Sequence, residues 1–197
     1  EMNDYRLKKF QGSFYLTGFM GAGKSAIGSR LAKNLELPFH DLDKYLIKKE
    51  GKTIPEIFKE HGEEYFREKE WEYLLELTKA FKGVVALGGG ALQNQRIVDH
   101  LKLHGLIVFL DTPMDVILDR VLRNPKRPIV RNSDGEIKSR ETLKNELETL
   151  YSNRIEFYNQ AQVKLTTTGK DDKSLVVDRL IEKIKQHVSW RFAESYD

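Results

Sequence analysis

The sequence contains no cysteine, and this absence removes several kinds of chemistry. Disulfide bonds, thiolate metal sites and cysteine nucleophiles are excluded, and a chain without cysteine suits a reducing compartment. No apolar run approaches the ~18 residues that a membrane-spanning helix needs, and the first residues lack the basic stretch and apolar core of a signal peptide. We therefore expect a cytoplasmic protein that does not bind membranes.

Charge of one sign is also scarce. The 33 Lys and Arg residues barely outnumber the 30 Asp and Glu residues, for a net charge of +3. Nucleic-acid-binding domains usually have a stronger basic bias, so we expect small anions as partners and no nucleic acid. The five histidines show no metal-site spacing. The length of 197 residues fits one domain with a substantial core.

Short apolar segments alternate along the chain with segments of helical periodicity. The segments that are typical of strands are 14–17, 37–41, 84–87, 106–110 and 163–166. Those with helical spacing are 24–36, 64–81, 95–104, 113–123, 139–159 and 174–188. This order predicts an α/β fold with a central five-stranded parallel sheet and helices on both faces. The surplus of helix predicts a helical insert beside the sheet.

Two segments lack such patterns. Residues 124–139 contain two prolines, an Asn-Ser-Asp-Gly turn sequence and four basic residues, a composition typical of a mobile loop. Residues 189–197 are polar and aromatic, and we expect a loosely held C-terminal extension. The domain core therefore covers about residues 12–188.

The clearest motif is a phosphate-binding loop at residues 18–25, Gly-Phe-Met-Gly-Ala-Gly-Lys-Ser, which matches G-x-x-x-x-G-K-[ST] between a predicted strand and a predicted helix. Its glycines let backbone N–H groups surround phosphate oxygens, where the helix start adds partial positive charge. Lys24 adds a charge at the outer phosphates, and the Ser25 hydroxyl can ligate Mg²⁺. A glycine-rich turn without a ligand is the alternative.

Two acids, Asp41 and Asp43, close the second predicted strand. Ligands of parallel sheets bind beyond the carboxyl ends of the strands, and residues two apart in an extended segment face the same side. One carboxylate would serve the metal shell, and the other would meet a substrate hydroxyl. The alternative is that Asp43 caps the following helix.

Two other strand ends are ambiguous. Asp111 follows an apolar strand, as a Walker B magnesium ligand would, but Asp111-Thr112-Pro113 also resembles a capped helix start. We favour the cap because Asp41 is a competing metal-side acid. Gly88-Gly89-Gly90 predicts backbone that approaches a ligand closely, with a flexible turn as the alternative.

Two arginines occupy unexpected helix faces. Arg154 lies inside the apolar arc of the 139–159 helix, and Arg67 lies at the edge of the arc of the 64–81 helix. A guanidinium that faces the core needs an anion, and arginine binds carboxylates through two parallel bonds, so a substrate carboxylate is one explanation. Pairing of Arg67 with Glu70, or outward extension of either side chain, is the alternative.

Two further arginines lie in or just before the 124–139 segment. Arg127, in Lys126-Arg127-Pro128, would reach a transferring phosphoryl group after closure of a lid, or would simply be an exposed loop charge. Arg120, in the preceding helix, could stack on a base.

Taken in order, these motifs resemble the shikimate kinase family, small P-loop kinases of the nucleoside-monophosphate-kinase type. The resemblance runs from about residue 14 to 188. The phosphate loop is shared by many families, whereas the ordered set of Asp-x-Asp, Phe66-Arg67 and the three glycines is much more specific. Lys126-Arg127-Pro128 and Arg154 with Tyr158 follow in the family's order.

The resemblance implies ATP-dependent phosphorylation of the 3-hydroxyl of shikimate, in aromatic amino-acid biosynthesis, with one Mg²⁺ per active site. It implies a three-layer P-loop kinase fold, a substrate-binding helical region at about 42–72 and a lid at about 124–139; we expect a monomer. The implied catalytic residues are Asp43, Lys24 and Arg127. The implied ATP-binding residues are Gly21, Ala22, Gly23, Lys24, Ser25, Ala26, Arg120 and Arg127. The implied substrate-binding residues are Asp43, Arg67, Gly89, Gly90 and Arg154, and the implied metal-site residues are Ser25 and Asp41.

Three positions depart from the family pattern. Ala26 replaces a usual Thr, Leu87 a frequent Thr, and Glu156 a common Pro. The alternatives to a shikimate kinase are another small-molecule P-loop kinase, of gluconate or nucleotide type, and a nucleotide-binding module without catalytic activity.

Overall fold

The computed structural model describes residue 7 and residues 10–194, with the backbone alone for 189–194. Five parallel strands form one sheet in the order β2-β3-β1-β4-β5. Their bounds are β1 Ser13–Thr17, β2 Phe39–Asp41, β3 Val84–Ala86, β4 Gly105–Asp111 and β5 Val163–Thr166. The predicted five-stranded parallel sheet is thus confirmed. Because β1 lies in the middle, the loop that follows it opens at the centre of the carboxyl edge.

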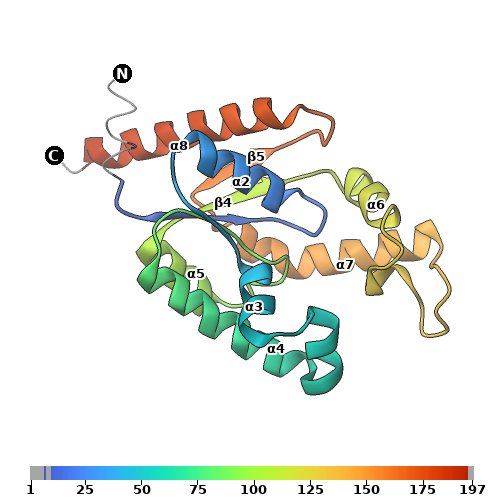
Figure 1. Cartoon of the computed structure of the whole chain (residues 1–197). Coiled ribbons are helices and arrows are strands. Elements are labelled where there is room, and N and C mark those ends of the chain that lie inside the picture. Colours follow the sequence, from blue (N-terminus) through green and yellow to red (C-terminus); the bar gives the residue numbers. More distant parts are fainter. Residues whose placement is uncertain (1–6, 8–9, 195–197) are drawn as a thin grey trace.

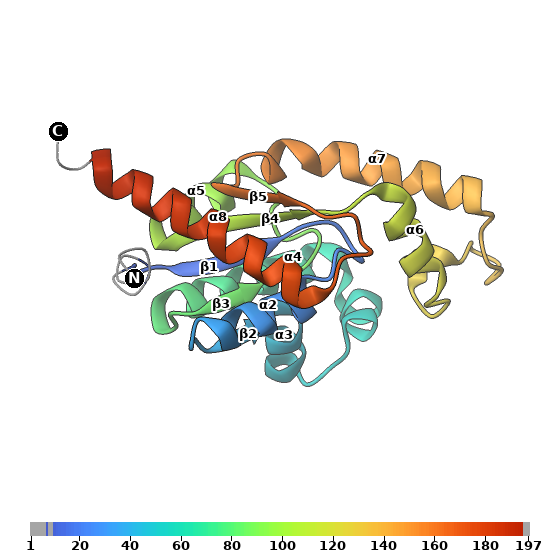
Figure 2. The same cartoon turned by 90° about the horizontal axis from the view of Figure 1, so that it is seen from above.

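Helices cover both faces of this sheet, so the predicted three-layer arrangement is also confirmed (Figures 1 and 2). The helices are α2 Lys24–Asn34, α3 Leu42–Glu50, α4 Ile54–Ala80, α5 Gln95–His104, α6 Met114–Leu122, α7 Arg140–Tyr158 and α8 Lys173–Glu194, with a 3₁₀ helix at Pro128–Val130. Helices α2 and α8 pack on one face, and α4, α5 and α7 lie on the other. No helix of the described chain is long and apolar enough to cross a membrane.

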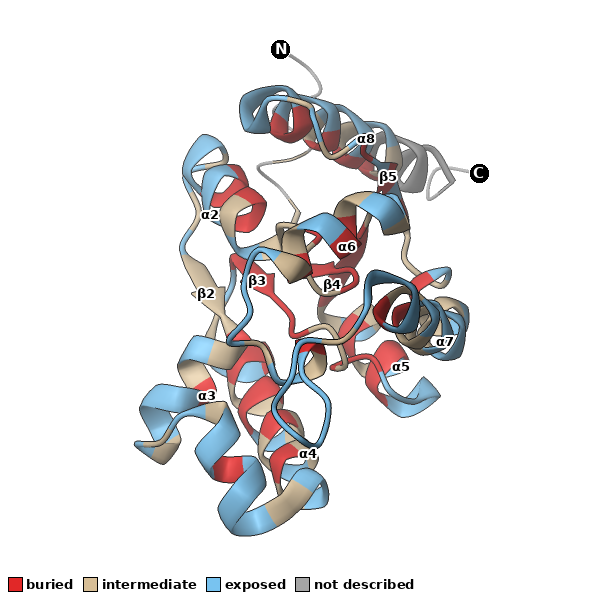
Figure 3. Ribbon diagram, turned by 90° about the vertical axis from the view of Figure 1, so that its right-hand side faces the viewer, coloured by how far each residue is buried: buried red, intermediate tan, exposed pale blue. Residues whose placement is uncertain are grey.

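The strands divide their side chains between two cores. Phe14 and Leu16 of β1 pack with α2 and α8, whereas Tyr15 points to the opposite core. Successive side chains of a strand face opposite ways, so a strand covered on both sides reads as a continuous apolar run. Seen from the carboxyl edge, β3 and β4 are buried between exposed helix surfaces (Figure 3).

Helix α4 consists of two helical segments that meet at Gly62. Thr53 starts the first through a capping box with Glu56. Gly62 has φ 83° and ψ 175°, which interrupts the helix before the segment that carries Arg67. Helical periodicity predicted only the second segment, whereas the first segment lies in the helical region at about 42–72 that the family resemblance implied.

The alternative that Asp43 caps a helix and the expectation that Asp111 does so are both wrong. Helix α3 begins at Leu42 with Asp41 as its cap, so Asp43 sits in the first turn instead of capping it. Asp111 does not cap α6, which follows Pro113 without a side-chain cap. Asp111 instead accepts a hydrogen bond from the Tyr151 hydroxyl at 3.0 Å.

The C-terminal extension expected at residues 189–197 is described in part. The backbone of α8 continues through residues 189–194, so this part is helical; residues 195–197 lie outside the described residues. The predicted lid segment, 124–139, contains more structure than its composition suggested. It holds the 3₁₀ helix and a turn closed by a bridge between Arg131 and Ile137.

Candidate functional site

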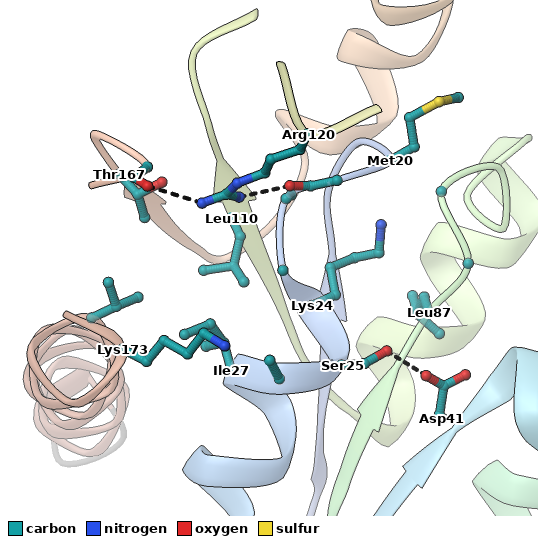
Figure 4. Close-up of a pocket in the computed structure, with 18 of the residues that line it drawn as sticks. Met20, Lys24, Ser25, Ile27, Asp41, Leu87, Leu110, Arg120, Thr167 and Lys173 are labelled. Atoms are coloured by element: carbon teal, nitrogen blue, oxygen red, sulfur yellow. Dashed lines mark hydrogen bonds between the residues drawn. The ribbon is translucent and has the colours of Figure 1, made fainter. Parts of the chain in front are cut away.

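A cavity of about 600 Å³ opens at the carboxyl edge of the sheet. It is lined by residues 20–25 of the phosphate loop (residues 18–25) and the start of α2, by the ends of β2 and β3, and by the loop after β5. Arg120 of α6, Arg127 of the lid segment, Leu110 at the end of β4 and two residues of α8, Lys173 and Val176, also line it. Figure 4 shows Lys24, Ser25, Asp41 and Arg120 around this space. Ligand binding at this edge follows from the parallel topology.

The phosphate loop has the geometry of an anion cradle. Gly21 and Gly23 have φ values of 73° and 86°, which side-chain-bearing residues rarely adopt. The first N–H to bond within α2 is that of Ile27, which donates to the Gly23 carbonyl at 2.9 Å, so the N–H groups before it have no partner in the helix. These donors face the cavity that Ala22, Gly23, Ser25 and Ala26 line.

Lys24 curls back over the loop. Its ammonium group donates to the carbonyl oxygens of Gly18 at 2.6 Å and Phe19 at 3.1 Å. Burial lowers the pKa of Lys24 to about 8, an effect that the nearby Asp43 carboxylate partly offsets. A buried cation beside backbone donors attracts phosphate oxygens.

Ser25 and Asp41 meet at the foot of the cradle. The Ser25 hydroxyl donates to one carboxylate oxygen of Asp41, and the other oxygen accepts from the backbone N–H of Lys44 at 3.1 Å (Figure 4). Within the described residues, no group of three or more His, Cys, Asp or Glu side chains is arranged to hold a metal. A hydroxyl and one fixed carboxylate instead suit Mg²⁺, which keeps waters and takes further oxygens from substrate phosphates.

Two arginines stand over the cavity. Arg120 donates to the carbonyl of Gly21 at 2.7 Å and to that of Gly169 at 3.0 Å, and it thereby joins the phosphate loop to the loop after β5. Arg127 lines the cavity, and its buried Nε has no partner in the described part of the chain. An unpaired buried donor favours an incoming acceptor.

Asp43 lies between this cradle and the glycine segment, Gly88–Gly90. Burial and the Asp41 carboxylate raise the pKa of Asp43, while Lys24 and Arg67 act in the opposite direction. A Cβ atom at Gly88 would lie only 2.9 Å from Asp43 Oδ1, so the carboxylate is packed against this backbone.

Arg67 approaches the other end of the glycine segment. A Cβ at Gly90 would lie 2.6 Å from Arg67 Nη2. Arg67 Nη1 also donates to Glu70 Oε1 at 2.9 Å, so the Glu70 pairing that the sequence left open does form. Its side chain is 23% exposed, and the guanidinium lies over the Phe66 ring.

Glu70 has a larger role than the pairing with Arg67 that the sequence suggested. It is 3% exposed and also accepts from Gln93 at 3.1 Å, and burial raises its pKa. A sequence signal was available: Glu70 is four residues from both Phe66 and Leu74, on the buried face of α4.

Arg154 reaches the middle of the glycine segment from α7. A Cβ at Gly89 would lie 3.6 Å from Arg154 Nη1, and the Arg154 guanidinium stands 5.6 Å from the centroid of the Phe19 ring. Tyr158, one turn later and buried, donates to the Gly89 carbonyl at 2.6 Å. Glu156 is exposed and turns away from this contact. Both helix arginines therefore face the backbone that borders Asp43.

Of the remaining departures, Ala26 and Leu87 both line the cavity without offering a hydroxyl. Every residue that the sequence proposed for the site therefore lies on the cavity or against the glycine segment beside it. Arg67, Gly90 and Arg154 belong to the second group.

Comparison with known proteins gives a consistent result. A family model described as Shikimate kinase matches residues 20–185. Among curated proteins, the shikimate kinase of Staphylococcus haemolyticus is 43% identical over 154 residues, 78% of this chain and 84% of that protein. That of Chloroherpeton thalassium is 35% identical over 174 residues, 88% of this chain and 92% of that protein. Among solved structures, an Acinetobacter baumannii shikimate kinase in complex with shikimate has a TM-score of 0.79 at 31% identity, covering 92% of this chain and 96% of that one.

Proposed function

The chain belongs to the shikimate kinase family, and we propose how its residues carry out the ATP-dependent phosphorylation of shikimate. The observation that carries the proposal is the position of Asp43. This carboxylate lies between a phosphate cradle and a glycine segment that two arginines border. A hydroxyl held there would face the terminal phosphate of a nucleotide in the cradle.

On the donor side, we propose that Gly21, Ala22, Gly23, Lys24, Ser25 and Ala26 bind the phosphates of ATP. Arg120 would pack on adenine. Mg²⁺ would be held by the Ser25 hydroxyl and, through water, by Asp41, since both offer oxygen donors at the foot of the cradle. When bound, the metal offsets charge on the phosphate oxygens.

On the acceptor side, Arg67 and Arg154 would bind the shikimate carboxylate, and Gly89 and Gly90 would contact the substrate through their backbone. A planar guanidinium matches a carboxylate with two parallel hydrogen bonds. Glu70 holds Arg67 Nη1 from the buried side, and Arg67 Nε lies 3.8 Å from Glu63 Oε1, which leaves Nη2 for the ligand.

In the reaction, Asp43 would orient the 3-hydroxyl and accept its proton while the oxygen attacks the γ-phosphorus in line with the departing ADP oxygen. Lys24 and Arg127 would stabilise negative charge on the transferring group. Closure of the lid segment over this group would exclude water, which otherwise competes for the phosphoryl group.

We further propose a single kinase domain over about residues 12–188 that works as a cytoplasmic monomer, with ATP and shikimate as its partners. The proposed ligand-binding residues all come from one chain, and the modest charge of +3 gives no basis for nucleic-acid binding.

A coupled assay of ADP release tests the function directly. We expect release from MgATP that depends on shikimate, with little release when gluconate or a nucleoside monophosphate replaces it. Equal release with gluconate or a nucleotide would favour a different kinase. Binding of ADP without any turnover would favour a nucleotide-binding module.

A further inference from the structure

The loop after β5 brings one more positive charge to the cavity, and none of the roles above uses it. Lys173, the first residue of α8, lines the cavity together with Ala26 and Ile27 of α2. Figure 4 shows its side chain extended from α8 toward α2. A charge in this position faces the start of the helix that follows the phosphate loop.

Other charged groups of this region are already engaged. Asp171 accepts from the Thr168 backbone N–H at 3.3 Å and from its hydroxyl at 3.0 Å, and it lies 3.5 Å from Arg179 Nη1. Arg120 donates to two backbone carbonyls. The side chain of Lys173 has no hydrogen bond or ion pair with any other residue in the range 10–188, whose side chains are described. Its ammonium group therefore keeps its donors for a ligand.

The path of ATP through the cavity brings a phosphate to this ammonium group; this step rests on the proposed function. The phosphate loop holds the outer phosphates, and the base lies at the opposite end, near Arg120 and Gly169, whose carbonyl Arg120 contacts. The α-phosphate then passes the start of α2, where Ala26 offers a backbone N–H but no side-chain donor. We infer that Lys173 binds the α-phosphate of ATP.

This role makes a distinctive kinetic prediction. The α-phosphate keeps its charge and its position when the γ-phosphoryl group moves, so the contact stabilises ATP, the transition state and ADP alike. Such uniform binding lowers KM for ATP without raising kcat. Lys173 is thus an ATP-binding residue and takes no part in the chemical step.

The experiment compares Lys173→Met with Lys170→Met. Lys170 is an exposed lysine three residues before Lys173, in the loop after β5, and it does not line the cavity, so it is a matched control. We expect Lys173→Met to weaken ADP and AMP about fivefold by calorimetry, as for a partly exposed charge contact, and to raise KM for ATP similarly. Adenosine affinity, kcat and KM for shikimate stay at wild-type values, as all parameters do in Lys170→Met. Lys173→Arg restores most of the ADP affinity.

Two results would overturn the inference. Equal ADP affinity in Lys173→Met and Lys170→Met would show that the ammonium group does not touch phosphate. Adenosine weakened as much as ADP would assign Lys173 to the ribose or the base. Neither result affects the function itself. Conversely, if the wild-type protein bound ADP through Lys173 but did not phosphorylate shikimate, the proposed function would fail and the contact would stand.

Discussion

On the donor side of the cavity most proposed contacts come from one short loop, whereas on the acceptor side they come from four segments far apart in the sequence. The phosphate loop presents backbone N–H groups whose direction is set by φ angles at glycine. The acceptor side relies on side chains from α3, α4 and α7 that meet at the glycine segment. Backbone recognition leaves a compact motif, whereas recognition by side chains requires the tertiary fold to bring them together.

A second difference concerns how each side holds its charges. Lys24 rests on carbonyl oxygens of its own loop. Arg67, by contrast, is held by Glu70, which Gln93 also contacts. The donor side should therefore tolerate changes elsewhere in the fold, while the acceptor side should depend on a network of buried side chains. Each prediction below tests whether the two sides can be disturbed separately.

The largest effect is expected at Asp43, which borders both sides. Asp43→Asn removes the group proposed to accept the hydroxyl proton, so kcat should fall about 10²–10⁴-fold. ADP affinity, measured by calorimetry, should change little because the cradle remains. Asp178→Asn, on the exposed surface of α8, is the control. Unchanged turnover in Asp43→Asn would remove Asp43 from the chemistry.

A substitution at Arg127 tests how the donor side acts in the chemical step. Arg127→Met should lower kcat about a hundredfold, because the guanidinium is proposed to stabilise charge that develops on the moving phosphoryl group. The neighbouring exposed Lys126→Met should leave kcat near the wild-type value. Equal losses in the two variants would mean that the lid segment contributes only general positive charge.

Arg154 tests the acceptor side by itself. Arg154→Lys should raise KM for shikimate about thirtyfold, since an ammonium group cannot form two parallel bonds to a carboxylate. ADP affinity should stay unchanged, and Arg123→Lys, at an exposed position, should have no effect on either quantity. A normal KM in Arg154→Lys would refute the carboxylate contact.

The pH dependence of ADP binding tests the donor side through Lys24. Burial lowers the pKa of Lys24 to about 8, and a bound phosphate raises it again. The complex then holds more protons than the free enzyme above pH 8, so affinity decreases as pH rises, about fivefold between pH 8 and 9. Calorimetry should show this decrease in the wild-type protein but not in Lys24→Arg, whose side chain does not titrate in this range. An identical slope in both would assign the effect to another group.

The elements that the sequence predicted correctly are those that neighbouring residues determine. The phosphate loop, the five strands and the inward face of Arg154 follow from glycine spacing, apolar runs and helical periodicity. The structure places these elements as expected. In each case the decisive residues lie within a few positions of one another.

The errors occurred where the partner of a residue is distant or a signal is absent. The sequence favoured Asp111 as the cap of the next helix. Asp111 instead accepts a hydrogen bond from the hydroxyl of Tyr151, forty positions away. Glu70 was weighed only as the neighbour of Arg67, and its contact with Gln93 depends on how α4 packs. The helix predicted over 174–188 continues to Glu194, since no Gly or Pro occurs between 174 and 197 to end it.

The close approach of Arg67 and Asp43 to the glycine segment limits which amino acids can occupy it. Gly88 and Gly90 do not have positive φ values, so their backbone conformation does not require glycine. Glycine is required because Asp43 and Arg67 occupy the space that a Cβ atom would need. Any side chain at position 90 would displace the Arg67 guanidinium, and any at position 88 would push against Asp43. In a lineage that kept nucleotide binding but lost the acceptor site, this constraint would disappear. We therefore expect substitutions at positions 88 and 90 to accompany the loss of phosphotransfer in such a lineage.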